Sequence, residues 1–526
     1  MPSIIAYLVF FSWPLVVFLI FRKLDLVPAI VWSMLVGFLM LPLRVEIDLP
    51  ALPTISKYEL TSLMVAIMAF VKLREAEQAR QWAANASGVP VAPSAPPARK
   101  SKMRLVTNIM LAIVIITPLM TVMNNSDPIF AGPTYIPGLR VYDALSMIGG
   151  KAFVLLPFFV GRRFLTTPES HVVILRVLVL SLMAYTVLGF YEVRMSPQLN
   201  RMFYGFFPHS FLQHIRAGGF RPLVFLSHGL ILGIFMTLAI LSAAAMWRHA
   251  KSVGESSFFW AFCTIWLLMS LYMFKSVGAF VIAVLLLPVV LFTRVRTQLL
   301  VAAVMAVVVL LYPVLRGAGY IPTDEIHEIA LQYSEDRAQS LEFRLDNEDT
   351  LLAKANERPL LGWGSWGRNQ IYDSVTGEMT SVTDGIWIII IGTAGWVGYL
   401  AQFGLLTVPL VLFALHARRL DVSVATAGLA IVLTANMIDM LPNSGMRPFT
   451  WLIAGALVGR FIAVREGTPA ADVPRDVETA TPAATPASNG LIVRKPRGMP
   501  GQHAEPDIAP DMVAAGAGGP KRRVRR

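Results

Sequence analysis

Residues 223–247 read LVFLSHGLILGIFMTLAILSAAAMW and contain no Asp, Glu, Lys or Arg. A helix rises about 1.5 Å per residue, so about 20 mostly apolar residues cross the hydrocarbon core of a bilayer. This stretch is long enough to do so, and similar apolar runs precede and follow it along the chain. Together these runs predict an all-α fold, a polytopic bundle of transmembrane helices.

The composition agrees with such a bundle. The 526 residues are 55% hydrophobic and only 15% charged, and the mean hydropathy is +0.61. Soluble domains carry about 25% charged residues, so a soluble enzyme, a secreted disulfide scaffold and a disordered protein are excluded. The net charge of +12 fits the Lys and Arg excess of cytoplasmic loops and implies no nucleic acid. A single cysteine, Cys263, allows no intramolecular disulfide and no multi-cysteine metal site.

The apolar runs predict about thirteen spans. They cover residues 3–21, 26–42, 59–73, 105–123, 143–161, 172–190, 223–247, 257–274, 278–293, 298–315, 386–415, 422–441 and 448–464. Basic pairs, such as Arg162 with Arg163 and Arg418 with Arg419, recur in alternate loops and mark the cytoplasmic side. The alternation predicts a periplasmic N-terminus and a cytoplasmic C-terminus.

Four parts follow from this layout: N-terminal helices at 1–73, a cytoplasmic linker at 74–104, a membrane core at 105–464 and a cytoplasmic tail at 465–526. The linker and the tail are rich in Ala, Pro, Ser and Gly, which predicts disorder. The tail ends in PKRRVRR, which predicts either contact with the inner leaflet or a solvated end.

Two periplasmic loops of the core are long, at residues 191–222 and 316–385, and long loops are usually functional. The second loop is acidic, with 13 Asp and Glu against 6 Lys and Arg. Apolar residues within 324–357 recur at roughly helical spacing. We therefore expect a large, partly helical loop with one or two amphipathic helices.

The first long loop ends in HSFLQHIRAGGFRP, where Arg216 and Arg221 flank Gly218 and Gly219. Paired glycines allow a tight turn and close backbone approach. Two guanidinium groups at the membrane edge could hold an anion bidentately, and a lipid-linked pyrophosphate lies at that depth. The alternative is that both arginines only extend their charged ends to the interface.

The second long loop contains NERPLLGWGSWGRN, a turn rich in Gly with Trp363 and Trp366. Indole rings can stack on sugars, and the alternative is an aromatic belt at the membrane interface. Lys275 and Arg316 lie near the outer ends of spans and are further candidates for substrate binding. Arg358 and Arg368 of the second long loop are candidates for the same role.

Asp384 precedes the next apolar run and is the first candidate for a general base, with Glu357 second. Asp384 could equally cap the following helix. Asp439 and Arg447 could simply pair across a short turn, and His228 could be a packed histidine. No metal-binding or nucleotide-binding motif is recognisable, so we expect neither a metal nor a nucleotide cofactor.

Four segments in order resemble the O-antigen ligase and O-antigen polymerase superfamily of bacterial inner-membrane proteins. They read IRAGGFRPLVFLSHGLILGIFM, FKSVGAFVIAVLLLPVVLF, ERPLLGWGSWGRN and TDGIWIIIIGTAGWVGYLAQFGLL. The resemblance covers roughly residues 191–414. Where ligases carry His before the Gly-rich helix, this chain has Asp384, which favours a polymerase of exopolysaccharide or O-antigen repeat units over a ligase.

The resemblance implies an inverting, metal-independent glycosyltransferase of the bacterial inner membrane. Its donor would be an undecaprenyl-pyrophosphate-linked glycan and its acceptor a sugar hydroxyl at the periplasmic face. Arg216, Arg221 and Arg316 match the positions expected to hold the pyrophosphate. Chain-length and export proteins of polysaccharides are the implied partners. A ligase, and a non-enzymatic transporter or flippase of lipid-linked glycans, remain alternatives.

Overall fold

The computed structural model describes residues 1–48, 53–87, 101–216, 218–333, 335–420 and 422–467. Contacts divide the chain into the units Met1–Arg475 and Asp476–Arg526, and every described residue belongs to the first unit. Most of the predicted tail therefore lies outside the described residues.

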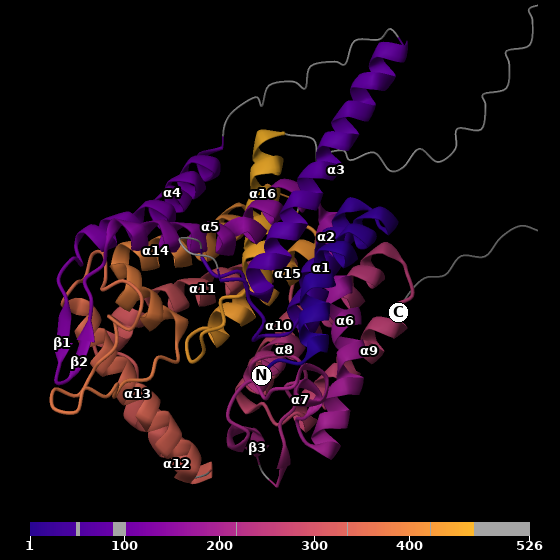
Figure 1. The fold of residues 1–526 in the computed structure, drawn as a ribbon. Coiled ribbons are helices and arrows are strands. Elements are labelled where there is room, and N and C mark those ends of the chain that lie inside the picture. The colour runs from indigo at the N-terminus through magenta and orange to yellow at the C-terminus, as the bar shows by residue number, and fades with distance from the viewer. Residues whose placement is uncertain (49–52, 88–100, 217, 334, 421, 468–526) are drawn as a thin grey trace, which may run out of the picture. The chain divides into compact units, whose positions relative to one another are not determined.

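The described part is almost entirely helical (Figure 1). The α-helices are α1 (Ile4–Lys23), α2 (Leu26–Met40), α3 (Lys57–Ser87), α4 (Lys102–Met123), α5 (Val141–Phe164), α6 (Pro168–Met195), α7 (Leu199–Tyr204), α8 (Gly229–Val253), α9 (Phe258–Met273), α10 (Val277–Phe292), α11 (Val295–Gly317), α12 (Thr323–Tyr333), α13 (Glu335–Asn356), α14 (Ile386–His416), α15 (Val424–Asp439) and α16 (Pro448–Glu466). A short 3-10 helix spans Leu212–His214. Two small antiparallel hairpins join β1 (Ile129–Ala131) to β2 (Thr134–Ile136) and β3 (Ile215–Arg216) to β4 (Gly219–Phe220).

Eight of the described helices are long and apolar enough to cross a membrane, namely α1, α4, α5, α6, α8, α11, α14 and α16. The apolar helices α2, α9, α10 and α15 are shorter. Each predicted span overlaps one helix of the structure. The expectation of an all-α, multi-pass membrane protein is thus supported, while the number of crossings and the side of each loop stay predictions.

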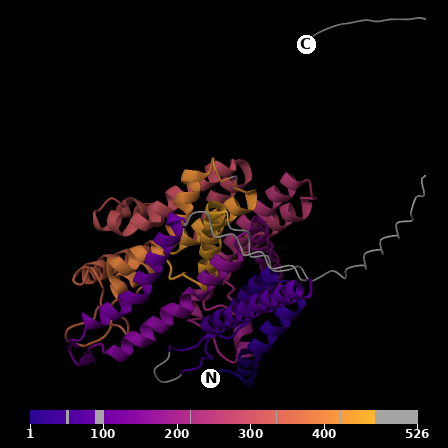
Figure 2. The ribbon, with the colours of Figure 1, turned by 90° about the horizontal axis from the view of Figure 1, so that it is seen from above.

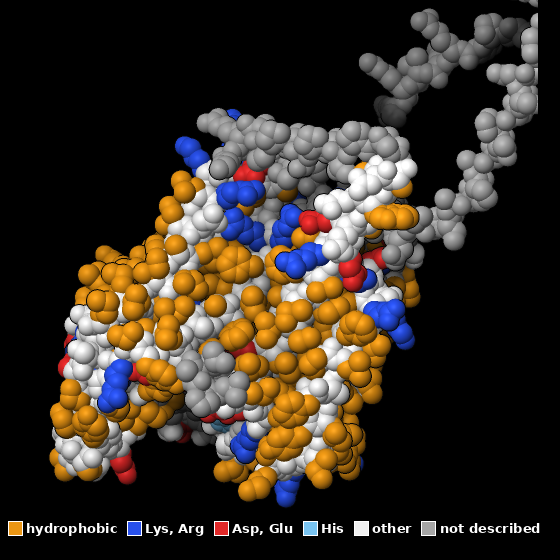
Figure 3. Space-filling view, turned by 45° about the horizontal axis from the view of Figure 1, so that its top comes forward, with side chains coloured by type: hydrophobic (Ala, Val, Ile, Leu, Met, Phe, Trp, Pro, Cys, Tyr) orange, Lys and Arg blue, Asp and Glu red, His pale blue; other side chains and the backbone are white. Residues whose placement is uncertain are grey.

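Two contacts join segments that are expected on the same side of the membrane. At one end, the backbone N–H of Ser3 donates to the carbonyl of Tyr204 over 2.8 Å. At the other end, Arg104 forms an ion pair with Glu466. Figure 3 shows hydrophobic side chains over the middle of the molecule and Lys and Arg gathered toward its top, and the last turns of α5 and α16 carry Arg162, Arg163 and Arg465.

Helices distant in sequence form the core. Helix α16 packs along α5, α11 packs on α14 and α15, and α8 lies against α6, α9, α10 and α15. Seen from above, the indigo helices α1 and α2 lie on one side and the orange α14 on the other (Figure 2). Helix α8 is buried on nearly all faces. Side chains of its first turn therefore face other parts of the protein.

The structure differs from the sequence expectation in the linker. Helix α3 continues to Ser87, so residues 74–87 of the expected disordered linker are helical. The stretch REAEQARQ at 74–81 is rich in strong helix formers, which explains the extension. The acidic loop agrees with the expectation of one or two helices, since it contains α12 and α13.

Candidate functional site

The hairpin β3–β4 carries Arg216 and lies directly before Arg221. Arg216 pairs with Gly219 across the hairpin, and Gly218 has φ +70°, so the predicted tight turn is confirmed. A Cβ on Gly219 would lie 2.4 Å from Nζ of Lys275. The missing side chain leaves room for the ammonium group of Lys275, which donates to the carbonyl of Arg216 over 3.0 Å.

Residues 223–228 come soon after the hairpin as a non-helical segment whose first four residues are buried, so the helix of the predicted span at 223–247 begins later, at Gly229. The buried carboxylate of Glu192 on α6 accepts from the backbone N–H of Leu223 over 2.9 Å and of Val224 over 2.7 Å. Val224 has φ +55°, a value that a β-branched residue rarely adopts. Glu192 thus holds a turn that apolar composition alone does not indicate.

Two further buried groups fix the same segment from α6 and α3. The backbone N–H of Phe225 donates to the hydroxyl of Tyr185 over 3.1 Å, and Nζ of Lys57 donates to the carbonyl of Phe225 over 3.4 Å. Because unsatisfied backbone groups are costly in a buried site, these contacts stabilise the turn. They place Arg221 at one end of the segment and His228 at the other.

His228 is the N-cap of α8. Its Nδ1 accepts from the backbone N–H of Leu230 over 3.0 Å, and its Nε2 lies 3.3 Å from Oε1 of Gln213. Burial, reinforced by the neighbouring His214 and Arg221, lowers the pKa of His228 to about 3. The ring is therefore neutral near pH 7, with its proton on Nε2 facing Gln213, and it serves as a cap as well as lining the site.

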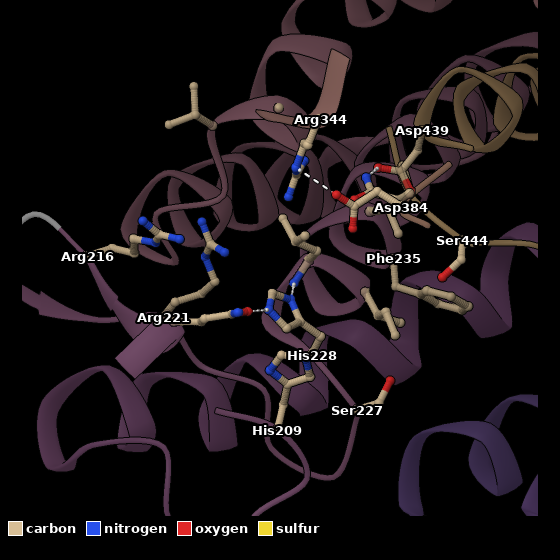
Figure 4. A pocket seen from close by; sticks show the side chains of 18 of the residues that line it. His209, Arg216, Arg221, Ser227, His228, Phe235, Arg344, Asp384, Asp439 and Ser444 are labelled. Atoms are coloured by element: carbon tan, nitrogen blue, oxygen red, sulfur yellow. Dashed lines mark hydrogen bonds and ion pairs between the residues drawn. The ribbon is translucent and has the colours of Figure 1, made fainter. Parts of the chain in front are cut away.

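A cavity of about 760 Å³ opens beside the hairpin and α8. Its polar lining comes from distant segments (Figure 4). The charged members are Arg216, Arg221, Lys275, Arg344, Arg447, Asp384 and Asp439. The apolar members include Leu230, Ile231, Ile234, Phe235 and Val277. Five cationic side chains against two carboxylates give the cavity a formal excess of three positive charges.

Asp384 faces this cavity and does not cap α14. The N-cap of α14 is Gly385. The carboxylate of Asp384 instead forms an ion pair with Arg344 of α13, with Oδ2 3.1 Å from Nε and both side chains 35% exposed. The helix-cap interpretation of Asp384 therefore has no support in the structure, whereas a carboxylate that faces a cationic cavity fits a role in chemistry.

Asp439 and Arg447 both line the cavity. The hydrogen bond of the Asp439 carboxylate is to Asn443 rather than to Arg447, the partner expected from the sequence. Oδ1 of Asp439 accepts from Nδ2 of Asn443 over 2.9 Å. Arg447 lies over the ring of Tyr58, with 5.7 Å between its Cζ and the ring centroid. The cavity thus gains a second carboxylate and a further cation from the turn between α15 and α16.

Arg316 lies elsewhere in the structure. It is buried, and its Nη2 donates to Oδ2 of Asp349 over 2.8 Å and to the carbonyl of Leu345 over 3.3 Å. These contacts join α11 to α13. Glu357, the second candidate base, pairs with Lys354 over 2.9 Å and does not line the cavity.

Arg358 and Arg368 also donate to protein oxygens away from the cavity. Arg358 pairs with Asp127 over 2.7 Å and donates to Oδ1 of Asn125 over 2.9 Å. Arg368 is fully buried and donates to the carbonyls of Pro137 and Asp127, each over 2.9 Å. Both arginines therefore attach their turn to the loop that follows α4.

The two tryptophans of that turn behave differently from each other. Trp363 is 7% exposed and its Nε1 donates to the carbonyl of Lys354 over 2.8 Å. Trp366 is 54% exposed. Neither lines the cavity, so their predicted role in sugar binding gains no support from their position.

The Gly-rich turn fills a break in helix α14. Gly395 has φ +66° and ψ −175°, which interrupts the helix. The freed carbonyls of Gly392 and Thr393 accept from the N–H groups of Trp363 and Gly364 over 2.8 and 3.1 Å. A Cβ on Gly395 would lie 2.3 Å from the backbone of Leu360, so the two segments require glycine at their contact.

The structure thus brings four predicted site residues to one cavity and leaves five outside it. Arg216, Arg221, Lys275 and Asp384 line the cavity, and Arg316, Arg358, Arg368, Trp363 and Trp366 do not. Sequence reasoning missed Arg344, Gln213 and Asn443. The available signal for Arg344 was weak: it is one of few arginines in an acidic loop.

Within the described ranges, no group of three or more His, Cys, Asp and Glu side chains could hold a metal ion. Whether the site uses a metal stays a prediction. No known family model matches the chain, and neither does any curated protein. The resemblance noted from the four sequence segments therefore stays an expectation.

Proposed function

We propose that this protein transfers a glycan from an undecaprenyl-pyrophosphate-linked oligosaccharide to an acceptor sugar hydroxyl at the periplasmic membrane face. The single observation that carries the proposal is the cavity in which Arg216, Arg221, Lys275, Arg344 and Arg447 meet Asp384. Polymerisation of exopolysaccharide or O-antigen repeat units is the favoured form, because Asp384 stands where ligases carry His.

The cationic excess suits a departing diphosphate. In the transfer, the acceptor oxygen attacks the anomeric carbon while the bond from that carbon to the diphosphate oxygen breaks. The electron pair stays on the diphosphate, which gains negative charge. Fixed cations stabilise this charge more in the transition state than in the bound substrate, which is what accelerates a reaction.

Asp384 would take the proton of the attacking hydroxyl. A carboxylate within reach of the acceptor contributes by orienting the hydroxyl and accepting its proton late in the attack. The cations and Asp384 lie around one cavity, so attack opposite the leaving group is feasible and would invert the anomeric centre.

The apolar lining fits the lipid part of the donor. Ile231, Ile234 and Phe235 lie on the first two turns of α8, next to Val277 at the start of α10. A polyprenyl chain could follow these side chains into the bilayer while the diphosphate stays with the arginines and the glycan reaches water.

A transporter of lipid-linked glycans is the second candidate, because α14 is broken at Gly395 and transporters place broken helices at their binding sites. The freed backbone groups of α14 are already bonded to the Gly-rich turn, which favours the enzyme.

The test uses purified protein in detergent with a polyprenyl-diphosphate-linked oligosaccharide. An enzyme lengthens the glycan and releases polyprenyl diphosphate without an ion gradient. Unchanged glycan lipid in detergent, together with its movement across sealed proteoliposomes, would instead establish the transporter.

A further inference from the structure

The cavity contains one ion pair whose two members would have to separate for the proposed chemistry. Arg344 and Asp384 are 3.1 Å apart and both are partly open to solvent. The guanidinium group of Arg344 occupies Oδ2 of Asp384, one of the two oxygens that could accept a proton from the acceptor hydroxyl. The acceptor therefore cannot reach that oxygen while Arg344 stays with it.

The diphosphate of the proposed donor would be a second anionic partner for Arg344 in the same cavity. In Figure 4, the guanidinium groups of Arg216 and Arg221 lie on one side, Asp384 lies on the other, and Arg344 reaches in between. A diphosphate held by Arg216 and Arg221 would thus face Arg344 as well. It offers more negative charge and more acceptor oxygens than one carboxylate does.

The backbone around Arg344 is fixed, so only its side chain needs to move. One turn later on α13, Tyr312 donates to Glu348 over 3.2 Å, and Arg316 pairs with Asp349 over 2.8 Å. Oδ1 of Asn347 accepts from the backbone N–H of Val382 over 2.8 Å, close to Asp384 in the chain. A solvent-exposed ion pair is weak, so the guanidinium can change partner without moving these anchors.

We infer that Arg344 exchanges partners when the donor binds: it leaves Asp384 for the diphosphate and thereby frees the carboxylate to act as the base. This inference rests on the proposed function. The exchange makes Asp384 available as a base only after the donor has bound. The position of the Arg344 side chain would thus require the donor to bind before the acceptor hydroxyl is activated. Arg344 is thus both a ligand of the diphosphate and a positioning residue for Asp384.

The experiment is a double-mutant cycle on the binding of inorganic pyrophosphate to the full-length protein in detergent, measured by calorimetry. Arg344→Ala should weaken binding about tenfold. Asp384→Asn should tighten binding about threefold to fivefold in the wild-type background, because Arg344 no longer has a competing partner. In the Arg344→Ala background, the same Asp384→Asn change should tighten binding clearly less.

Equal effects of Asp384→Asn in both backgrounds would overturn the exchange, because the carboxylate would then act only through its own charge. Arg344→Lys keeps a cation and gives a second cycle should the alanine variant fail to fold. Arg74→Ala, at an exposed cation near the middle of α3 that does not line the cavity, controls for general loss of charge.

The outcomes also separate the two proposals. Absence of pyrophosphate binding to the wild-type protein would overturn the proposed function and the exchange together. Binding with no coupling between Arg344 and Asp384 would overturn the exchange alone. Coupling in the binding assay without glycan transfer would support the change of partner by Arg344, but it would overturn the proposed function and with it the role of Asp384 as the base.

Discussion

The hairpin at residues 215–220 and the turn at residues 359–368 look alike in sequence but are used in opposite ways. Each combines glycines and an arginine with at least one aromatic residue. The hairpin directs Arg216 toward a cavity. The turn bonds its backbone to the break in α14 and its Arg368 to backbone carbonyls. The two arginines thus differ in their surroundings, because Arg216 lines a cavity whereas Arg368 is fully buried and bonded to backbone carbonyls.

The largest effect is expected from replacing one arginine in each of the two regions. Arg221→Ala should lower glycan transfer about a hundredfold to a thousandfold, because one fixed donor to the departing charge is lost. Arg368→Ala should instead lower the melting temperature, because its buried carbonyl partners lose their donors. Transfer rates per folded protein would show this contrast. Equal loss of rate in both variants would place the turn in the site after all.

Asp384→Asn should lower the transfer rate about a hundredfold and leave the melting temperature unchanged. The reason is that Gly385, rather than Asp384, is the N-cap of α14. Rate and thermal unfolding should be measured on the same preparation. A normal rate with lowered stability would show that the carboxylate is structural.

Gly395→Ala tests the turn at the break in α14. The new Cβ would meet the backbone of Leu360 at 2.3 Å in a conformation with φ +66°, which should cost about 2–4 kcal/mol of stability. Gly254→Ala is the matched control, because Gly254 has φ +77° but nothing within 4 Å of a Cβ. It should cost about 1 kcal/mol. Equal melting temperatures of the two variants would contradict the close contact.

In the region of the hairpin, His228 should make the stability of the protein depend on pH. An unfolded histidine binds its proton near pH 6.5, whereas burial lowers the pKa of His228 to about 3. The unfolded chain therefore binds more protons between these values, so stability falls as the pH falls through this window. His228→Asn keeps a good N-cap and removes the titration.

Between about pH 7.5 and about pH 5, the wild-type protein should lose roughly 1–2 kcal/mol more stability than the His228→Asn variant. Thermal unfolding at the two pH values measures the difference. Parallel losses in both proteins would mean that His228 keeps an ordinary pKa.

The smallest expected effect belongs to Trp366. Its ring is 54% exposed and does not line the cavity, so Trp366→Ala should change stability by less than about 0.5 kcal/mol and leave the transfer rate unchanged. A clear rise in KM for the acceptor, measured with the same glycan donor, would restore the predicted role of this ring in sugar binding.

Much of the fold could be predicted from the sequence because its determinants are local. Apolar runs and the spacing of apolar residues in the acidic loop indicated the helices, including the pair α12 and α13. The glycines at 218 and 219 indicated the β3–β4 hairpin. Each of these signals lies within the segment that it describes.

The roles of the individual arginines could not be predicted, because they depend on partners far away in the chain. Arg358 is 231 residues from Asp127, its ion-pair partner, and residues 223–228 leave the helix because Glu192 of α6 holds them. Composition and periodicity alone thus determined a helical, multi-pass membrane protein. The tertiary structure decided which cations face a cavity, because a guanidinium group bonds whichever acceptors the folded chain brings to it.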